Sequence, residues 1–506
     1  MRKLEEELKQ YAASDMYPFH MPGHKRRGDA VCRTDITEID GFDNLHDPED
    51  LIRGEMDFAK AFYGTKETYF LVNGSTVGIL TAISAAVRPG GRILIERGCH
   101  ISVYHAAYLR GLHIDYLDFG ERSGQRPDAI VITSPTYEGA VKPVRKIAAY
   151  AHSLGVPLIV DEAHGAHFSM HPYFPESAVR QGADLVIQST HKTLPALTQT
   201  ALLHNATGLV PDERIRKFID IYETSSPSYV LMASITKAIH RAAEGGGAAF
   251  EPYAERLKGL RHALAGLSNL RLFGGEDCVT TERDSAVSCV PGMPVDPGKI
   301  VIETDRSSIS GPELYDRLRT GFHLQPEMKA PEYVILMTSV NDTQEGFDRL
   351  IAALREIDRE VGPERPDGLH AAEAADRAAG GDALIIPERA RTAADESTQA
   401  GTAASENRSV CAPAAMTIAE AADAEREIVP LDQAAGRIAG DYIIVYPPDS
   451  PLVVPGERFT EENIRTIRDR IRAGLTVTGI RYGQMPEQDL VEVVAHWLVT
   501  GPASVV

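Results

Sequence analysis

The 506-residue sequence contains little that would cross-link it or hold it in a membrane. It has five cysteines, and no two of them form a Cys-x-x-Cys pair. An odd, scattered set of this kind does not predict a disulfide framework and is typical of proteins kept in a reducing compartment. The N-terminus lacks the apolar core of a secretion signal, and no apolar run is long enough to span a membrane. We therefore expect a cytoplasmic protein without a membrane partner.

A basic surface is also missing. The 72 acidic residues outnumber the 52 lysines and arginines, and the formal net charge is -20. Because binding to a phosphate backbone requires clustered positive charge, this balance argues against a nucleic-acid partner. Hydrophobic residues make up 43% of the chain, which is ordinary for a globular protein, and the length predicts more than one domain.

Short apolar strands alternate with helices from about residue 55 onward. The pattern predicts strands at 68–72, 92–96, 130–133, 158–160 and 185–187, with a helix at 77–87. Fully apolar strands that alternate with helices indicate an α/β fold with a mostly parallel sheet covered on both faces. In such sheets ligands bind beyond the carboxyl ends of the strands, so the residues that follow each strand are the first candidates for a site.

Composition and pattern divide the rest of the chain. We expect an amphipathic helix at 1–13, strands at 299–303 and 333–337, and a closing helix at 342–358. Large apolar residues are scarce from 363 to 425, so this stretch is predicted to be a flexible, low-complexity insertion. The expected segments are a large α/β domain with the N-terminal segment, a smaller α/β domain, the insertion, and a C-terminal domain, at 1–250, 251–362, 363–425 and 426–506.

Lys192 and Asp161 each follow an apolar strand. Taken alone, a lysine is most often an exposed side chain, and a carboxylate at a strand end most often caps the following turn. Taken together, they are the pair that pyridoxal 5′-phosphate (PLP) chemistry requires. The lysine forms the Schiff base, and the carboxylate keeps the pyridine nitrogen protonated so that the ring can accept electrons.

Small and hydroxyl residues at a third strand end are candidates for holding the phosphate. Gly74, Ser75 and Thr76 lie between a strand and a helix, where free backbone N–H groups and the positive end of the helix dipole favour an anion. The alternative is a plain helix N-cap, for which serine is a standard choice. Ser189 is placed to add a further hydroxyl to the phosphate.

Four more residues at strand ends are candidates for the cofactor ring and for proton transfer. Ala163 would lie under the ring, and His164 would hydrogen-bond the phenolic oxygen of the ring. His100 offers a flat imidazole that could stack on the pyridine, the alternative being a surface histidine. His191, beside Lys192, is a candidate proton shuttle because the ordinary pKa of histidine is close to neutrality.

At this point the chain resembles the prokaryotic ornithine/lysine/arginine decarboxylases, PLP enzymes of the aspartate-aminotransferase fold (fold type I). The matching motifs are His20-Met21-Pro22-Gly23-His24-Lys25, Asp43-Asn44-Leu45-His46 and Ser134-Pro135-Thr136-Tyr137-Glu138-Gly139, together with 35–39, 72–76, 161–168, 188–199, 224–229, 446–448 and 455–457. They cover nearly the whole chain except about 363–425. The chain looks like the short form of the family, without the N-terminal wing domain.

The resemblance implies a role for each matching residue. Lys192 would be the Schiff-base lysine and Asp161 the partner of the pyridinium. Ser75, Thr76, Ser189 and His191 would surround the phosphate and the Schiff base, with His100 stacked on the ring. Thr224 and Ser225 would lie near a cofactor, in this family often the one held by the partner subunit, so a homodimer or larger homo-oligomer is expected. The C-terminal residues would form an α+β domain of the decarboxylase type.

The chain departs from the family pattern at Gly98, at Ile101, and at Asp449-Ser450 in the turn 446–451, where the resemblance predicts Gly-Ile. Gly98 stands where the resemblance predicts asparagine, and Ile101 stands where it predicts lysine. His100 between them is retained, so these departures bear on substrate contacts and efficiency rather than on cofactor binding.

We therefore expect PLP-dependent α-decarboxylation of a basic amino acid, arginine or lysine rather than ornithine, to give an amine of polyamine metabolism and CO2. A long cationic side chain needs a carboxylate at its far end, and the candidates are Glu38, Asp43, Glu327 and Glu457. No metal is expected. The alternatives are another fold-type-I PLP enzyme, such as an aminotransferase or an aldolase, and a catalytically weak regulatory paralogue.

Overall fold

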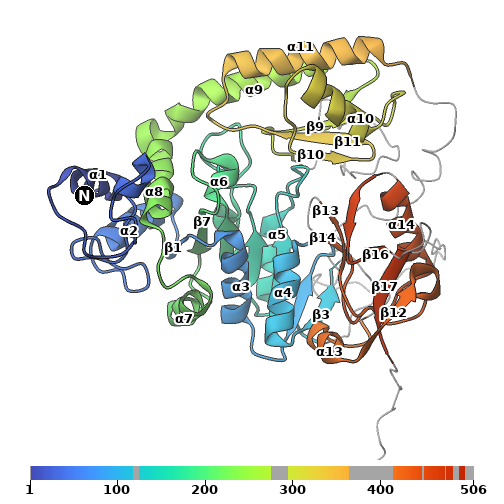
Figure 1. Cartoon of the computed structure of the whole chain (residues 1–506), viewed down its shortest axis with the longest axis horizontal. Helices are drawn as coiled ribbons and strands as arrows, with labels where there is room; N and C mark the ends of the chain where they lie inside the picture. Colours follow the sequence, from blue (N-terminus) through green and yellow to red (C-terminus); the bar gives the residue numbers. More distant parts are fainter. Residues whose placement is uncertain are drawn as a thin grey trace, which may run out of the picture. The chain divides into compact units, whose positions relative to one another are not determined.

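The computed structural model describes residues 2–117, 125–274, 294–363, 414–446, 450–472, 474–482 and 489–495 (Figure 1). The chain forms two compact units. Among the described residues, the first comprises 2–88, 126–274 and 294–363, and the second comprises 89–117, Gln125 and the described residues between 414 and 495.

The main sheet of the first unit carries the strand ends that the sequence singled out. Its strands lie in the order β1-β7-β6-β5-β4, which are Glu67–Leu71, Ala201–Asn205, Leu185–Gln188, Leu158–Asp161 and Ala129–Thr133. β4, β5 and β6 are parallel, whereas β7 is antiparallel to both β6 and β1. The predicted mostly parallel sheet is therefore confirmed, and β7 is a reversed strand that the sequence pattern did not predict.

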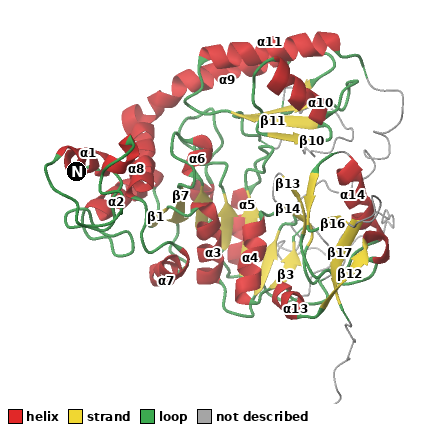
Figure 2. Ribbon diagram, viewed as in Figure 1, coloured by secondary structure: helices red, strands yellow, loops and turns green. Residues whose placement is uncertain are grey.

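Helices pack closely on this sheet because small residues allow it. α3 (Gly74–Ala86) contacts β1, β5, β6 and β7, and α5 (Val144–Ser153) contacts β5; both lie in front of the strands in Figure 2. A Cβ atom on Gly78 would lie 2.8 Å from Cγ2 of Ile187 in β6. Only glycine therefore fits at this crossing without displacing the helix.

The remaining helices of the unit lie before, between and after these strands in the sequence. The predicted N-terminal helix is confirmed as α1, with Leu4 and Leu8 buried one turn apart. The elements are α1 (Leu4–Ala13), α2 (Leu51–Tyr63), α6 (Thr190–Thr193), α7 (Asp212–Tyr222) and α8 (Tyr229–Ala243), and the 3-10 helices Ala30–Arg33, Ala178–Gln181 and Glu244–Phe250.

A smaller antiparallel sheet completes the first unit. Its order is β10-β11-β9-β8, which are Met328–Ala330, Tyr333–Met337, Lys299–Glu303 and Arg271–Leu272. α9 (Glu251–Leu264) and α11 (Gln344–Glu360) run side by side along it (Figure 1), and α10 (Gly311–Asp316) leads into a π-helical turn, Arg317–Gly321. The predicted strands at 299–303 and 333–337 and the closing helix are confirmed.

The second unit joins residues near position 100 to the C-terminal residues. β2 (Arg92–Ile95) and β3 (His113–Tyr116) are parallel and are connected by α4 (Ile101–Arg110). The C-terminal strands form the sheets β12-β17-β16 (Arg426–Pro430, Asp489–Val494, Arg481–Tyr482) and β14-β13-β15 (Ser450–Val453, Ile443–Tyr446, Thr476–Thr478), with α14 (Glu461–Arg472) and a 3-10 helix, Leu431–Gln433.

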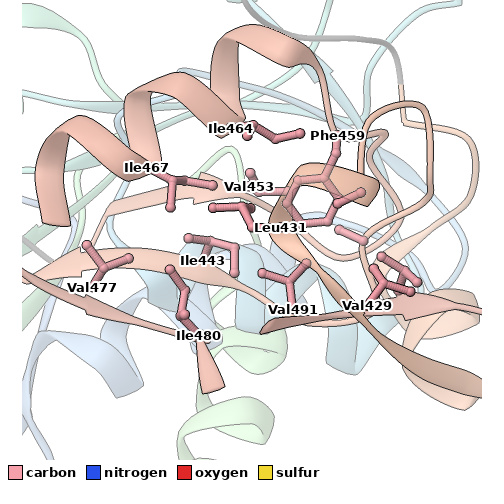
Figure 3. Packing of buried hydrophobic residues seen from close by; sticks show 13 residues of the cluster. Val429, Leu431, Ile443, Val453, Phe459, Ile464, Ile467, Val477, Ile480 and Val491 are labelled. Carbon is pink, nitrogen blue, oxygen red and sulfur yellow. The ribbon is translucent and has the colours of Figure 1, made fainter. Parts of the chain in front are cut away.

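Both C-terminal sheets and α14 share one hydrophobic core. Figure 3 shows Ile464 and Ile467 of α14 facing Ile443 of β13 and Val491 of β17, with Phe459 at one end of the cluster. These side chains are almost fully buried, and each buried aliphatic side chain of this size contributes about 1.5–3 kcal/mol. The core gives this region its own hydrophobic stabilisation.

The predicted insertion at 363–425 falls mainly on residues 364–413, which lie outside the described residues. Its last part contains a helix, α13 (Ile418–Asp423), which packs on α4. Thr417 and Glu420 form a capping box at its N-terminus, and Ile418 is buried. The division into four segments stays a prediction. Among the described residues, no helix is both long and apolar enough to cross a membrane.

Candidate functional site

Two neighbouring strand ends carry the predicted catalytic pair. Asp161 is the last residue of β5, and β6 ends at Gln188, followed by Ser189 and the short helix α6 that carries Lys192. β5 and β6 are parallel neighbours, with Asp161 opposite Ile187. The fold therefore brings Asp161 and the Ser189–Lys192 stretch to the same edge of the sheet, as predicted.

The side chains of Lys192 and His164 meet at this edge. Nζ of Lys192 lies 3.1 Å from Nε2 of His164, in the turn after β5. On the other side of the same imidazole, Nζ of Lys299 lies 2.7 Å from Nδ1. The ring of Tyr137 packs edge-on against His164 with the ring centroids 4.8 Å apart. Lys299 and Tyr137 thus belong to the site, although no role was predicted for either.

Ser189 is the residue whose surroundings point most clearly to a ligand. Its side chain is fully buried, and among the described residues its Oγ atom has no hydrogen-bond partner. A buried hydroxyl without a partner costs about 1–3 kcal/mol, so such an atom usually serves a ligand or ordered water. The predicted phosphate contact of Ser189 fits this observation. Ala163 and Asp161 are also buried, and the backbone N–H of Ala163 donates to Oδ1 of Asp161 over 3.1 Å.

The start of α3 lies near this edge of the sheet. Gly78 of α3 packs against Ile187, two residues before Ser189. The first turn of α3, which carries Ser75, therefore lies towards the end of β6. Gly74 has φ of +80°, a conformation that favours glycine, and a Cβ atom there would lie 4.0 Å from the carbonyl oxygen of Gln199. Asn73, the N-cap residue of α3, makes no capping hydrogen bond with its side chain. Its backbone N–H groups are therefore suited to an anion, together with the predicted Gly74, Ser75 and Thr76.

Glu223 ties the predicted Thr224 to this turn. The buried carboxylate of Glu223 accepts hydrogen bonds from the backbone N–H of Val72 (3.1 Å) and of Thr224 (3.2 Å). Burial raises the pKa of Glu223, and the backbone donors oppose that rise. Nε2 of His46 donates to the carbonyl of Thr224 over 2.8 Å. Ser225 is exposed, and its predicted position near a cofactor stays a prediction.

His191 has a defined proton position. Its Nδ1 lies 2.8 Å from the carbonyl oxygen of Thr200, and because a carbonyl only accepts, Nδ1 carries the proton. Burial is the main cause that lowers the pKa of His191, which keeps the ring neutral near pH 7. Nε2 then has its lone pair available, which agrees with the predicted role of His191 as a proton shuttle.

His100 belongs to the second unit, where it directly precedes α4 as its N-cap. Its Nδ1 accepts a hydrogen bond from the backbone N–H of Ser102 (3.2 Å), so the imidazole acts as the N-cap of the helix. The predicted stacking of His100 on a cofactor stays a prediction. Of the departures from the family pattern, Ile101 is the first residue of α4, and the carbonyl of Gly98 accepts a hydrogen bond from the hydroxyl of Ser450.

The four carboxylates considered for the substrate side chain have different surroundings. Asp43 accepts hydrogen bonds from backbone N–H groups at the start of α2, among them those of Glu49, Asp50 and Ile52. Burial acts to raise the pKa of Asp43, but these donors lower it overall. Glu457 pairs with Arg97 and accepts hydrogen bonds from the hydroxyl of Tyr116 and the backbone of Val454. Asp43 and Glu457 therefore have structural partners.

Glu38 and Glu327 remain as candidates for binding the cationic side chain of the substrate. Oε1 of Glu38 is buried and has no hydrogen-bond partner among the described residues. Oε1 of Glu327 accepts a hydrogen bond from the hydroxyl of Tyr137 over 2.8 Å, and Tyr137 packs on His164. Glu327 is exposed and is separated from the Lys192–His164 contact by one side chain.

A buried network of hydrogen bonds lies next to the ends of β5 and β6. Glu162 accepts from Ser177 (2.6 Å) and from the side-chain amide of Gln188 (2.6 Å). The oxygen of that amide faces Nε2 of His204 (3.1 Å), and Nδ1 of His204 faces the hydroxyl of Thr68 (2.9 Å). Glu162 directly follows Asp161 and Gln188 directly precedes Ser189, so this network holds the ends of β5 and β6 in place. Burial raises the pKa of Glu162 to about 7.

His204 makes stability depend on pH in a defined direction. Burial lowers its pKa from 6.5 to about 3. Between these two pH values His204 is therefore protonated in the unfolded chain but not in the folded protein. Stability is thus expected to fall as the pH drops from 6.5 towards 3, by up to about 3 kcal/mol between pH 7.5 and 4.5. In His204→Gln, which does not titrate, the fall in urea midpoint between these pH values is expected to be smaller than in the wild type. His262→Gln, at an exposed histidine on α9, is the control for the loss of an imidazole; an equal fall in His204→Gln and the wild type would contradict this assignment.

The sequence did not assign roles to three residues that the site contains. Lys299 was read as the start of a strand, Tyr137 as part of a motif, and Glu223 was not singled out. For Lys299 and Glu223 the available signal was a charged residue at the boundary of an apolar strand or helix, since burying such a side chain requires a specific partner.

Two family models match the chain. One, described as "Orn/Lys/Arg decarboxylase, major domain", matches residues 3–123 and 120–283. The other, described as "Orn/Lys/Arg decarboxylase, C-terminal domain", matches residues 397–471. The first alone covers more than half of the chain and contains Asp161, His164 and Lys192.

Curated relatives of similar length carry related names. The chain is 30% identical over 502 residues to an arginine decarboxylase of Bacillus subtilis (strain 168). The match covers 93% of this chain and 94% of the relative. It is 30% identical over 512 residues to an arginine decarboxylase of Halalkalibacterium halodurans. That match covers 95% of this chain and 94% of the relative. Among solved structures, the Francisella novicida lysine decarboxylase LdcF superposes with a TM-score of 0.77 at 17% identity, over 97% of this chain and 81% of the other. This last likeness supports the fold.

Proposed function

Because this chain belongs to the Orn/Lys/Arg decarboxylase family, we propose that it decarboxylates arginine with PLP held at Lys192. Full-length relatives named arginine decarboxylase support a basic amino acid as the substrate, and they favour arginine over lysine. The observation that carries the assignment of the site is the 3.1 Å contact between Lys192 and His164 at the sheet edge that ends in Asp161.

The residues present fit PLP in their chemistry. Lys192 would hold the group through Nζ, and the carboxylate of Asp161 would hold the positive charge on the ring nitrogen. The free helix N-terminus at Gly74–Thr76 and the buried hydroxyl of Ser189 would hold the phosphate. Ala163 leaves room beside the ring, and we retain His100 as the residue that would stack on it.

When bound, PLP supplies a ring that accepts the electron pair released as CO2 leaves. The protein's own residues arrange the rest. Asp161 is buried, so its charge acts in a poorly solvated site where it is worth more than in water. His191 holds a proton on Nδ1 and offers Nε2 to move a second proton near Lys192.

We further propose that Glu327 reads the cationic end of the substrate. Its carboxylate is held by Tyr137, one side chain away from His164, and a carboxylate can bind a guanidinium with two parallel hydrogen bonds. Glu38 is the second candidate, because its buried oxygen lacks a partner among the described residues. A cytoplasmic homodimer or larger homo-oligomer, in which Thr224 and Ser225 approach a cofactor, completes the proposal.

Measuring CO2 and amine release from arginine, lysine and ornithine tests the proposed substrate. We expect arginine to give the highest kcat/KM, with agmatine as the product. Glu327→Gln is expected to raise KM for arginine about 10-fold with a smaller change in kcat, because it removes a charged contact made in both ground and transition states. Glu345→Gln, in the first turn of α11, is the matched control. Higher kcat/KM with lysine, transamination products, or PLP binding without turnover of any of the three substrates would contradict the proposal.

A further inference from the structure

Lys299 is buried in the site and faces a ring nitrogen of His164. Only 3% of Lys299 is exposed, and its Nζ lies 2.7 Å from Nδ1 of His164. The same ammonium stands 4.9 Å from the centre of the Tyr137 ring, within range of a cation–π contact. Gly139 has φ of +102°, and a Cβ atom there would lie 2.9 Å from Cβ and Cγ of Lys299. The surrounding backbone therefore leaves a closely fitted space for this lysine.

Hydrogen-bond chemistry then dictates where the proton of His164 lies. A lysine ammonium has three donors and no acceptor. Nδ1 of His164, which faces Lys299, must therefore present its lone pair, and the single proton of the neutral imidazole is on Nε2. Nε2 is the atom that lies 3.1 Å from Nζ of Lys192, and Nζ can accept its proton as a hydrogen bond only as an uncharged nitrogen.

We propose that Lys299 is a positioning residue that holds the imidazole of His164 with its proton on Nε2, directed at Lys192 and at the cofactor atoms next to it. His164 then serves as a fixed donor rather than as an acceptor. This inference rests on the proposed PLP site, and it assigns the buried lysine a role that acts through a neighbouring residue.

The charges around Lys299 set the pH range in which this arrangement holds. Burial lowers the pKa of Lys299 from 10.5 to about 8, and Asp296 opposes that change. The groups that face it are Asp296, Glu138, Glu327, Lys192 and His164. Below pH 8 Lys299 is protonated and the constraint on His164 is present; as the pH rises through 8 the ammonium is lost, and with it the constraint.

The first experiment follows the absorption of bound PLP against pH in the holoenzyme. In Lys299→Met we expect the midpoint of the absorption change to rise by about one pH unit, because a fixed donor that favours the proton-free form is lost. We expect kcat for arginine to fall about 10-fold, with KM within a factor of two, as for loss of one positioned hydrogen bond. Lys299→Arg, which keeps a cationic donor, is expected to restore most of the midpoint.

Lys329→Met is the matched control. Nζ of Lys329 in β10 lies 5.2 Å from the centre of the Tyr315 ring, so this variant removes a similar lysine–tyrosine contact away from His164. Its midpoint is expected to equal that of the wild type.

A double-mutant cycle separates positioning from direct electrostatics. In the His164→Gln background, where the amide nitrogen supplies a donor without tautomers, Lys299→Met is expected to move the midpoint by less than about 0.3 units. A full shift in that background, or no shift in Lys299→Met alone, would overturn the proposal. Wild-type protein that binds no PLP would instead overturn the proposed function.

A measurement on the wild-type protein keeps the test independent of variant folding. The 15N spectrum of histidine-labelled protein, with the His164 signals identified by their absence in His164→Gln, reports which ring nitrogen is protonated. We expect a protonated Nε2 and an unprotonated Nδ1 at pH 7. A protonated Nδ1 would overturn the proposal.

Discussion

Lys192→Ala is expected to abolish arginine decarboxylation, with a loss of at least about 10⁴-fold in kcat. The alanine side chain removes the amine that would hold PLP, and no other lysine in the described part of the site occupies the position of Nζ beside Nε2 of His164. Measurement of CO2 release from labelled arginine, with the absorption spectrum of the same preparation, checks both the turnover and the loss of the bound-PLP band.

Lys146→Ala is the matched control for this variant. Lys146 is an exposed lysine on α5, and its replacement is expected to leave the spectrum and the activity unchanged. Retention of more than a few per cent of the wild-type rate in Lys192→Ala would contradict the assignment of Lys192.

Asp161→Asn is expected to lower kcat by about 10²–10³-fold while PLP stays attached. The amide keeps the shape of the side chain and still accepts the hydrogen bond from Ala163, but it no longer holds a negative charge against the ring nitrogen. The loss is expected in kcat more than in KM, because the charge acts on the step in which electrons enter the ring. Steady-state kinetics per PLP-loaded protein provide the measurement.

Asp184→Asn is the matched control at the opposite end of the same strands. Asp184 is also buried, and its carboxylate binds the backbone N–H of Leu158 (2.9 Å) and Nε2 of His152 (2.8 Å). Its replacement is expected to lower Tm while leaving kcat per loaded protein within about twofold, because it removes structural hydrogen bonds far from the chemistry. Equal kinetic losses in Asp161→Asn and Asp184→Asn would show that the effect of Asp161 is only structural.

The candidate catalytic edge could be predicted from the sequence because the relevant signals are local. Apolar strands that end in Asp161 and in Ser189–Lys192 can be recognised from a few neighbouring residues, and parallel pairing then brings their ends together. β7 was not predicted, although Ala201-Leu202-Leu203 is apolar, because its segment follows a loop and its reversed direction depends on pairing with β6 and β1.

Partners distant in the sequence explain what could not be predicted. Lys299 becomes part of the site only because the fold places it against His164, 135 residues earlier. Likewise, the pattern could not rank the four acidic candidates, because the hydrogen bonds that occupy Asp43 and Glu457 come from backbone geometry and from remote residues such as Arg97. The residue types suited to the site could thus be predicted from the sequence, but the hydrogen-bond partners of each carboxylate could not.

Peptide mapping after borohydride reduction tests the central assignment most directly. Reduction fixes PLP covalently to the lysine that holds it, and mass spectrometry of the digested wild-type protein then identifies that lysine. We predict one modified peptide, with the added mass on Lys192, in a preparation that releases agmatine from arginine. The added mass on Lys299 or on another lysine, or an active preparation with no modified peptide, would contradict it.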